Sequence, residues 1–130
     1  MIGSSDAEAI LNGLSVAVLV VDPDEAIIFA NPAAEQFFQS SISSLTKSAL
    51  PDLVLPDNPL LSLISKARVQ DSVIREFGFR LSTPRLGTRS VTVDCGPLGG
   101  NSGYLVLSFQ EHASAGRTIS IFLSIVNPSF

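Results

Sequence analysis

Few side chains in this sequence have the type and spacing that chemistry at a site requires. The 130 residues include one histidine, His112, and one cysteine, Cys95, so neither an internal disulfide nor a zinc or iron–sulfur site built from several cysteines can form. Asp22 and Asp24 place two carboxylates close together, but they flank a proline in a pattern typical of a turn. We therefore predict neither a metal site nor catalytic residues.

Glycines before the last predicted strand are a second candidate for chemistry, because glycine-rich loops can cradle phosphate groups. A phosphate-binding loop leads into the N-terminus of a helix, whereas these glycines stand between two predicted strands. The glycines are Gly96, Gly99, Gly100 and Gly103. The pattern also offers no nucleophile beside a base, and we predict a chain that is not an enzyme.

The composition is that of a single folded domain with few charges. Hydrophobic residues make up 45% and charged residues only 15%, against a typical charged fraction of about 25%. A net charge of -4 disfavours nucleic acid as a partner. The apolar runs at 16–21 and 119–126 are too short to span a bilayer, and the N-terminus lacks signal-peptide features. We expect a cytoplasmic protein with no membrane partner, whose sparsely charged surface favours association with protein.

Helical and extended patterns follow one another along the chain. Helices are expected within 1–14 and at 32–39, 44–50 and 59–69, and strands at 16–21, 26–30, 76–81, 90–95 and 104–109. The last three strands alternate apolar and polar residues, so we expect each to be half-buried, with Phe77, Phe79 and Leu81 on one face. The order predicts an α+β fold: a five-stranded antiparallel sheet with short helices packed on one face and an N-terminal amphipathic helix.

Residues 10–35 resemble the opening of a PAS domain. The matching features are Asp22, in the turn after the first strand, and Asn31-Pro32, at the step from the second strand into a helix. These residues also have a structural interpretation, since Asn is a strong helix N-cap and Pro is tolerated at the first helical position. Over residues 5–112 the chain is similar, more narrowly, to the sensory PAS domain of nitrogen-regulation sensor histidine kinases, the NtrB family.

This resemblance implies a domain organisation and a role. Residues 1–14 would be an N-terminal capping helix, 15–112 the PAS domain, and 113–130 a C-terminal tail or linker. The role would be that of a sensory and regulatory module in a two-component nitrogen-regulation kinase, which dimerises and relays a signal to a kinase region. The phosphoacceptor pattern of such kinases, His-Glu followed by Asn-Pro-Leu, is missing, so the kinase region would lie outside this chain.

The apolar stripe of the first helix is the candidate surface for a parallel homodimer, because this helix commonly meets a partner copy in PAS kinases. The stripe consists of Ile10, Leu11 and Leu14. A short helix is marginal unless it packs against something. The stripe therefore packs either against a second copy or against its own sheet.

The resemblance also bears on cofactors. Flavin-adduct PAS domains carry a cysteine in an Asn-Cys-Arg-Phe-Leu-Gln run, whereas Cys95 lies on a late strand. Haem PAS domains need a histidine on the helix at 59–69, which has none, and His112 is expected to be a solvated surface residue. We predict no cofactor and an aromatic core. The alternative is a small ligand in a helix–sheet cavity lined by Phe29, Phe38, Leu61 and Val106.

Overall fold

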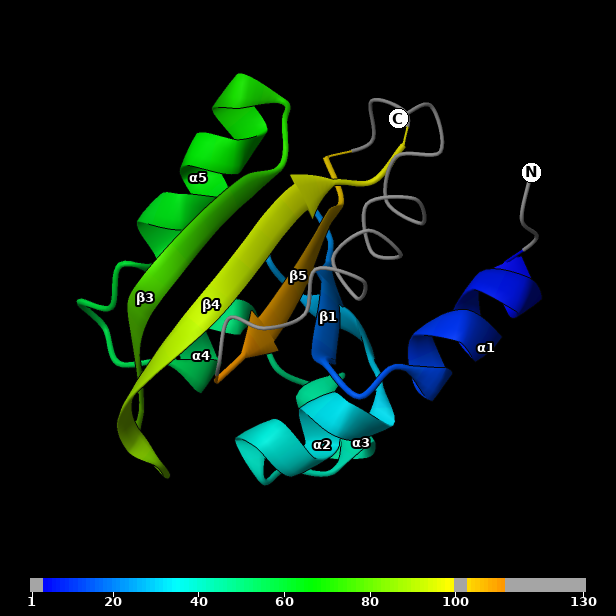
Figure 1. The fold of residues 1–130 in the computed structure, drawn as a ribbon, viewed down its shortest axis with the longest axis horizontal. Helices are drawn as coiled ribbons and strands as arrows, with labels where there is room; N and C mark the ends of the chain where they lie inside the picture. The colour runs from blue at the N-terminus through cyan, green and yellow to red at the C-terminus, as the bar shows by residue number, and fades with distance from the viewer. Residues whose placement is uncertain (1–3, 100–102, 112–130) are drawn as a thin grey trace.

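The computed structural model describes residues 4–99 and 103–111, and it shows one five-stranded antiparallel sheet with surrounding helices (Figure 1). The elements are α1 (Ser4–Gly13), β1 (Ala17–Val21), β2 (Ile27–Ala30), α2 (Pro32–Phe38), α3 (Ile42–Leu45), α4 (Leu50–Leu53), α5 (Leu60–Gln70), β3 (Ile74–Thr83), β4 (Gly87–Pro97) and β5 (Leu105–Gln110). The strand order is β2-β1-β5-β4-β3, and the predicted fold class is confirmed. His112 and the segment 113–130 lie outside the described residues.

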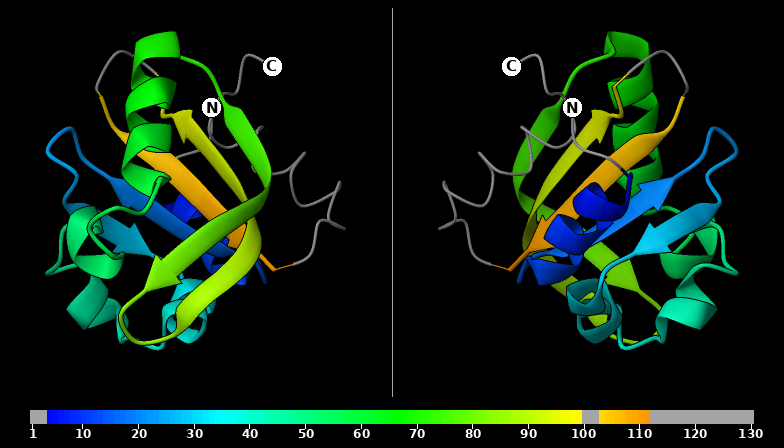
Figure 2. Two further views of the ribbon diagram at one scale, coloured as in Figure 1. Left: turned by 90° about the vertical axis from the view of Figure 1, so that its left-hand side faces the viewer. Right: turned by 90° about the vertical axis from the view of Figure 1, so that its right-hand side faces the viewer.

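Alternate residues of β1 point to opposite faces of the sheet and join two separate apolar clusters. Leu19 and Val21 belong to the main core, which the sheet forms with α2 to α5, whereas Val18 and Val20 pack with α1. Figure 2 shows α1 and α5 on opposite sides of the sheet. Because both faces are covered, β1 is buried along its whole length, which explains its continuous apolar sequence.

The other central strand, β5, is also buried on both faces, and so is β4 from Val91 to Gly96, so the expectation of half-buried strands is wrong for both. Val106 joins the α1 cluster, while Leu107 and Phe109 lie in the main core. Ser108 is buried as well, and its hydroxyl donates to the Oδ2 atom of Asp94 at 3.3 Å. The central position in the sheet decides this burial, and the alternation along one strand cannot reveal that position.

Strand β3 departs from the predicted pattern at Phe77. The pairing register with β4 shifts between Glu76 and Phe79, which marks a β-bulge. Gly78 in this bulge has a φ of 62°, a left-handed backbone conformation that glycine adopts without strain. Phe79 and Leu81 face the core as predicted, but Phe77 lies outside it and is 63% exposed.

Two helical segments also differ from the prediction. The helix expected at 44–50 is replaced by α3, which Ser41 caps through its hydroxyl, and by α4, which carries Pro51 in its first turn. In α5, where the apolar spacing predicts Leu61 on the buried stripe, the structure buries Leu63 instead, and Leu61 is only half-buried against the core. Both differences are small shifts of one turn or less and leave the order of elements unchanged.

Candidate functional site

Asn31 is fully buried and uses its whole side-chain amide for hydrogen bonds. Its Oδ1 atom accepts from the backbone N–H groups of Val18 and Ala34, each at 2.9 Å. Its Nδ2 atom donates to the carbonyl oxygens of Leu11 and Val16, also at 2.9 Å. The predicted cap of α2 is confirmed, and the same side chain additionally fixes α1 and the start of β1.

Asp22 and Pro32, the other two residues on which the resemblance to a PAS domain rests, also have structural roles. Pro32 is the first residue of α2, where its missing N–H costs nothing. The Oδ1 atom of Asp22 accepts from the backbone N–H groups of Asp24 and Ala26, both at 2.9 Å. One of the two neighbouring carboxylates is therefore used to close the β1–β2 turn.

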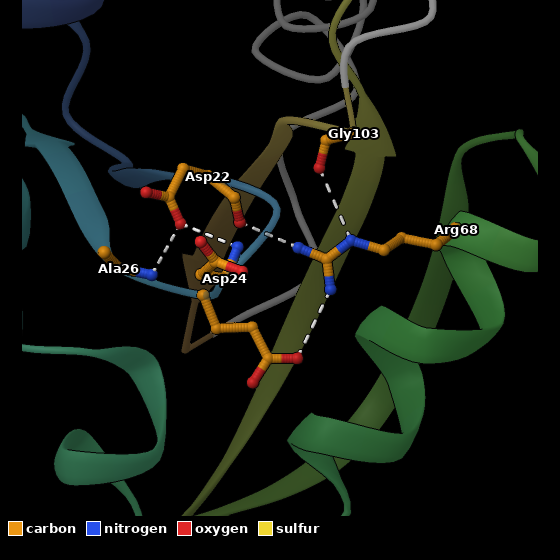
Figure 3. A network of polar contacts seen from close by, with 6 residues as sticks. Asp22, Asp24, Ala26, Arg68 and Gly103 are labelled. Carbon is orange, nitrogen blue, oxygen red and sulfur yellow. Dashed lines mark hydrogen bonds and ion pairs between the residues drawn. The ribbon is translucent and has the colours of Figure 1, made fainter.

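Arg68 on α5 joins three segments that are distant in sequence (Figure 3). Its Nη2 atom donates to the carbonyl oxygen of Asp22 at 2.9 Å, and its Nη1 atom pairs with the Oε2 atom of Glu25 at 3.3 Å. Its Nε atom donates to the carbonyl oxygen of Gly103, which precedes β5. Gly103 has a φ of 80°, and a Cβ atom on it would meet Pro23 at 3.0 Å. The β1–β2 turn is thus held between α5 and the segment before β5.

Aromatic rings fill part of the space between the helices and the sheet. The ring centroids of Phe37 and Phe38 lie 4.9 Å apart, and that of Phe109 lies 5.7 Å and 5.2 Å from them. The guanidinium of Arg89 lies 4.0 Å from the Phe37 centroid and pairs with Glu111 at 3.1 Å. Such ring pairs stabilise a packed core beyond the area they bury. The prediction of an aromatic core agrees with this cluster, except for the exposed Phe77.

The four residues of the predicted ligand cavity do not surround one space. Phe38 is in the main core and Leu61 packs against it. Val106 is in the α1 cluster on the other face of the sheet, and Phe29 packs against that cluster. The prediction of this cavity is wrong, because it placed residues from both faces of the sheet around one ligand.

A shallow cleft of ≈ 200 Å³ opens elsewhere, near the β3–β4 turn. It is lined by Phe38, Ser40, Ser48, Asp52, Leu53, Thr83, Pro84 and Arg85. Its polar groups already have partners within the fold: the guanidinium of Arg85 donates to the carbonyl oxygen of Gln39, and the hydroxyl of Thr83 accepts from the backbone of Leu86. The cleft is therefore a poor candidate for a specific ligand site.

The thiol of Cys95 lies in the main core. Burial raises its pKa from an ordinary value of 9.0 to about 12, with a smaller opposing effect of the positive charge of Arg68. A thiol of such a high pKa is protonated at neutral pH and is a poor nucleophile. Within residues 4–99 and 103–111, no cluster of three or more histidine, cysteine or acidic side chains could hold a metal ion.

The three residues of the apolar stripe on α1 differ in how far they are buried. Leu11 is buried in the cluster with Val18 and Val106, and Leu14 packs against that cluster. Ile10 remains 37% exposed. Most of the stripe therefore packs against its own sheet, and Ile10 alone is left at the surface. Among the described helices, none is both long and apolar enough to cross a membrane.

Sequence patterns did not single out Arg68 and Arg89, although each is a centre of contacts. Arg68 contacts a carbonyl 46 residues away, and Arg89 donates to the carbonyl oxygen of Phe37, 52 residues away. Contacts over such separations leave no trace in local periodicity. The available signal was weak: Arg68 stands between the apolar Ala67 and Val69, and Arg89 has no such neighbours.

Comparison with known proteins fits this geometry. A family model described as the PAS fold matches residues 5–111, and the chain belongs to the PAS family. The chain is similar to the sensory histidine kinase/phosphatase NtrB of Rhizobium leguminosarum bv. phaseoli, with 37% identity over 88% of this chain and 30% of that protein. It is also similar to NtrB of Rhizobium meliloti (strain 1021), with 32% identity over 88% of this chain and 31% of that protein. The resemblance noted from the sequence is confirmed.

Solved structures show the same fold. The PAS domain of nitrogen regulation protein NR(II) from Vibrio parahaemolyticus superposes with a TM-score of 0.67 at 23% identity, covering 81% of this chain and 96% of that one. A LOV protein of Rhodobacter sphaeroides gives a TM-score of 0.68 at 16% identity, covering 91% of this chain and 71% of that one. The chain spans less than a third of the length of the curated relatives named above.

Proposed function

We propose that this chain is the sensory PAS module of a two-component nitrogen-regulation histidine kinase. The observation that carries the proposal is its similarity to NtrB kinases over 88% of its length. Since the chain spans only 30% of such a relative, the partner that receives its signal would be a kinase region of the same full-length protein. The module itself would not be an enzyme and would act in the cytoplasm, where a free cysteine such as Cys95 is common.

The module would act without a bound cofactor. Phe37, Phe38 and Phe109 pack against one another where the helices meet the sheet. Phe38 and Phe109 are also almost completely buried, so a ligand there would have to displace well-packed rings. A signal would instead change the contacts between copies or between regions of the full-length protein.

The module would form a parallel homodimer through α1. Leu11 and Leu14 hold this helix against the outer face of the sheet, and Ile10 stays exposed beside them. A second copy could cover Ile10 without disturbing the packing of α1 on its own sheet. The cluster beneath α1 would then couple the dimer contact to the central strands β1 and β5.

The mass of the chain in solution tests the dimer. Light scattering on the eluting protein should give the mass of two chains, and Ile10→Asp should reduce it to one. Val69→Asp is the matched control, because Val69 is an even more exposed apolar residue on α5 and should leave the dimer intact. A monomer mass that does not change with concentration would refute the dimer.

The kinase role needs a separate test in the full-length protein. Ile10→Asp should change the rate of autophosphorylation, whereas Val69→Asp should not. An unchanged rate in a protein that has lost its PAS dimer would show that the dimer contact does not reach the kinase region.

A further inference from the structure

The bulge in β3 places an aromatic ring on the outer surface of the sheet. Phe77 is 63% exposed, and the guanidinium of Arg75 lies 5.3 Å from the centroid of its ring. Without the extra residue at the bulge, Phe77 and the buried Phe79 would share one face. Bulges commonly re-aim a side chain, and this one turns a large apolar group outward at a cost in burial.

Two arginines lie on the same face as Phe77. Arg75 pairs through its Nε atom with the buried Asp94 at 2.9 Å, and its side chain remains 30% exposed. Arg80 stands between the inward-facing Phe79 and Leu81, so its exposed side chain points to the outer face. We call Arg75, Phe77 and Arg80 the Phe77 patch.

The charge of the β3–β4 hairpin is opposite to that of the chain. Residues 74–97 hold four of the eight cationic residues and only two of the twelve acidic ones, although the whole chain has a net charge of -4. All four cations are arginines, the cationic residue most enriched in protein interfaces. Arg85 and Arg89 donate to carbonyl oxygens of the helical layer, which leaves Arg75 and Arg80 beside Phe77. Exposed phenylalanine and arginine together are typical of a recognition surface for an acidic, partly apolar partner.

The edge of β3 beside the patch is already covered in part. The backbone N–H of Leu55 donates to the carbonyl oxygen of Ser82 at 3.0 Å, and the Nδ2 atom of Asn58 donates to that of Arg80, also at 3.0 Å. The bulge interrupts the strand on the other side of Arg80. A partner therefore has no regular strand edge to extend, and it would bind on the face of the hairpin.

We propose that the Phe77 patch binds a carboxylate-rich segment of a partner protein. An apolar side chain of the partner would pack on Phe77, and its carboxylates would pair with Arg75 and Arg80. Nucleic acid fits less well, because two exposed arginines on a chain of net charge -4 offer a small footprint for a polyanion. The proposal needs neither the dimer nor the kinase region, and it can succeed or fail independently of them.

A titration followed by ¹⁵N–¹H spectra of the whole chain tests the proposal. The probe is a short peptide in which glutamates flank a pair of leucines, and the matched control peptide has glutamines in their place. The glutamate peptide should shift amides of β3 around Phe77 and of the facing part of β4, and high salt should weaken its binding. Phe77→Ser and Arg80→Gln should each weaken binding about fivefold to tenfold.

Val69→Ser is the matched protein control, because it removes an exposed apolar side chain from α5 and should leave binding unchanged. Phe77→Ser and Arg80→Gln alter exposed side chains, and well-dispersed spectra will show that both variants fold. Equal shifts with the glutamine peptide, shifts away from β3 and β4, or no binding would overturn the proposal. Stronger binding of a single-stranded RNA or of anionic lipid vesicles to the same amides would overturn the class of partner.

Discussion

The two hairpins at opposite ends of the sheet differ in charge and in how they are held. The β1–β2 turn carries Asp22, Asp24 and Glu25, and Arg68 ties it to the rest of the fold. The β3–β4 hairpin carries four arginines and a bulge that exposes Phe77. In the β1–β2 turn, Asp22 and Glu25 make internal contacts. In the β3–β4 hairpin three of the four arginines also have internal partners, but Phe77 and Arg80 are exposed. We call the first the anchor hairpin, because Arg68 ties it to the rest of the fold, and the second the open hairpin, because Phe77 and Arg80 on it are exposed.

Both edges of the sheet are nevertheless covered by segments from the helical layer. The backbone N–H of Ile27 in β2 donates to the carbonyl oxygen of Ser48, and that of Leu50 donates to the carbonyl oxygen of Glu25. On the other edge, Leu55 donates to Ser82 in β3. Part of each edge is occupied in this way, so we look for the difference between the hairpins in their faces and turns.

The largest loss of stability should come from Asn31→Ala, directly after β2 of the anchor hairpin. The change removes four hydrogen bonds and leaves their backbone partners without the side chain that satisfies them, at about 1–3 kcal/mol for each buried group. We expect the free energy of unfolding in urea to fall by about 4 kcal/mol or more, a large part of a typical domain's total. The control Pro32→Ala alters an exposed neighbour and should cost far less. A loss similar to that of the control would contradict the central role of Asn31.

A pair of substitutions in β3 tests the contrast between the faces of the open hairpin. Phe79→Ala should lower the free energy of unfolding by about 3 kcal/mol, because this ring is buried in the core. Phe77→Ala should change it by no more than about 0.5 kcal/mol, because that ring is mostly exposed. Urea denaturation of both variants measures the difference. Equal losses would mean that Phe77 is buried and that the bulge does not turn it outward.

The contacts that hold the anchor hairpin can also be removed by a substitution in α5. Arg68→Met keeps much of the aliphatic side chain but removes the contacts with Asp22, Glu25 and Gly103. Because the guanidinium is partly exposed, we expect a loss of only about 1–2 kcal/mol of stability. Hydrogen exchange should accelerate first at the amides of Asp24 and Ala26 in the turn. Uniform acceleration over the whole sheet would show that Arg68 supports global stability and not the hairpin in particular.

The sequence predicts those parts of the fold that depend on neighbouring residues. Asn31-Pro32 marks the start of a helix because a cap and a first-turn proline act within a few residues. The face of Phe77 could not be predicted in this way, since one extra residue in a strand reverses the face of every residue on one side of it. The grouping of Phe29 and Val106 with residues of the main core is wrong for another reason: local alternation does not show that both faces of the sheet are covered, and these two residues lie on the other face.

The candidate site was harder to predict than the fold. Arg68 becomes important only when the chain brings α5 beside a turn 46 residues away. Its residue type gives no hint of that contact, because an arginine near the end of a helix is also well placed to interact with the helix dipole. The local sequence pattern thus identified Asp22 in the turn. Its partner Arg68 became apparent only from the tertiary structure.

An effect confined to alkaline pH is expected at Cys95, on the inner face of the open hairpin. Burial raises the pKa of this thiol from 9.0 to about 12, so between these values the unfolded chain loses a proton that the folded chain keeps. The stability contributed by the neutral buried thiol is complete below pH 9 and is lost as the pH rises toward 12, at no more than about 1.4 kcal/mol per pH unit. Cys95→Ala should flatten the dependence by that amount, because it removes the thiol whose pKa is raised by burial. Parallel curves for the two proteins would mean that water reaches Cys95 in the folded chain.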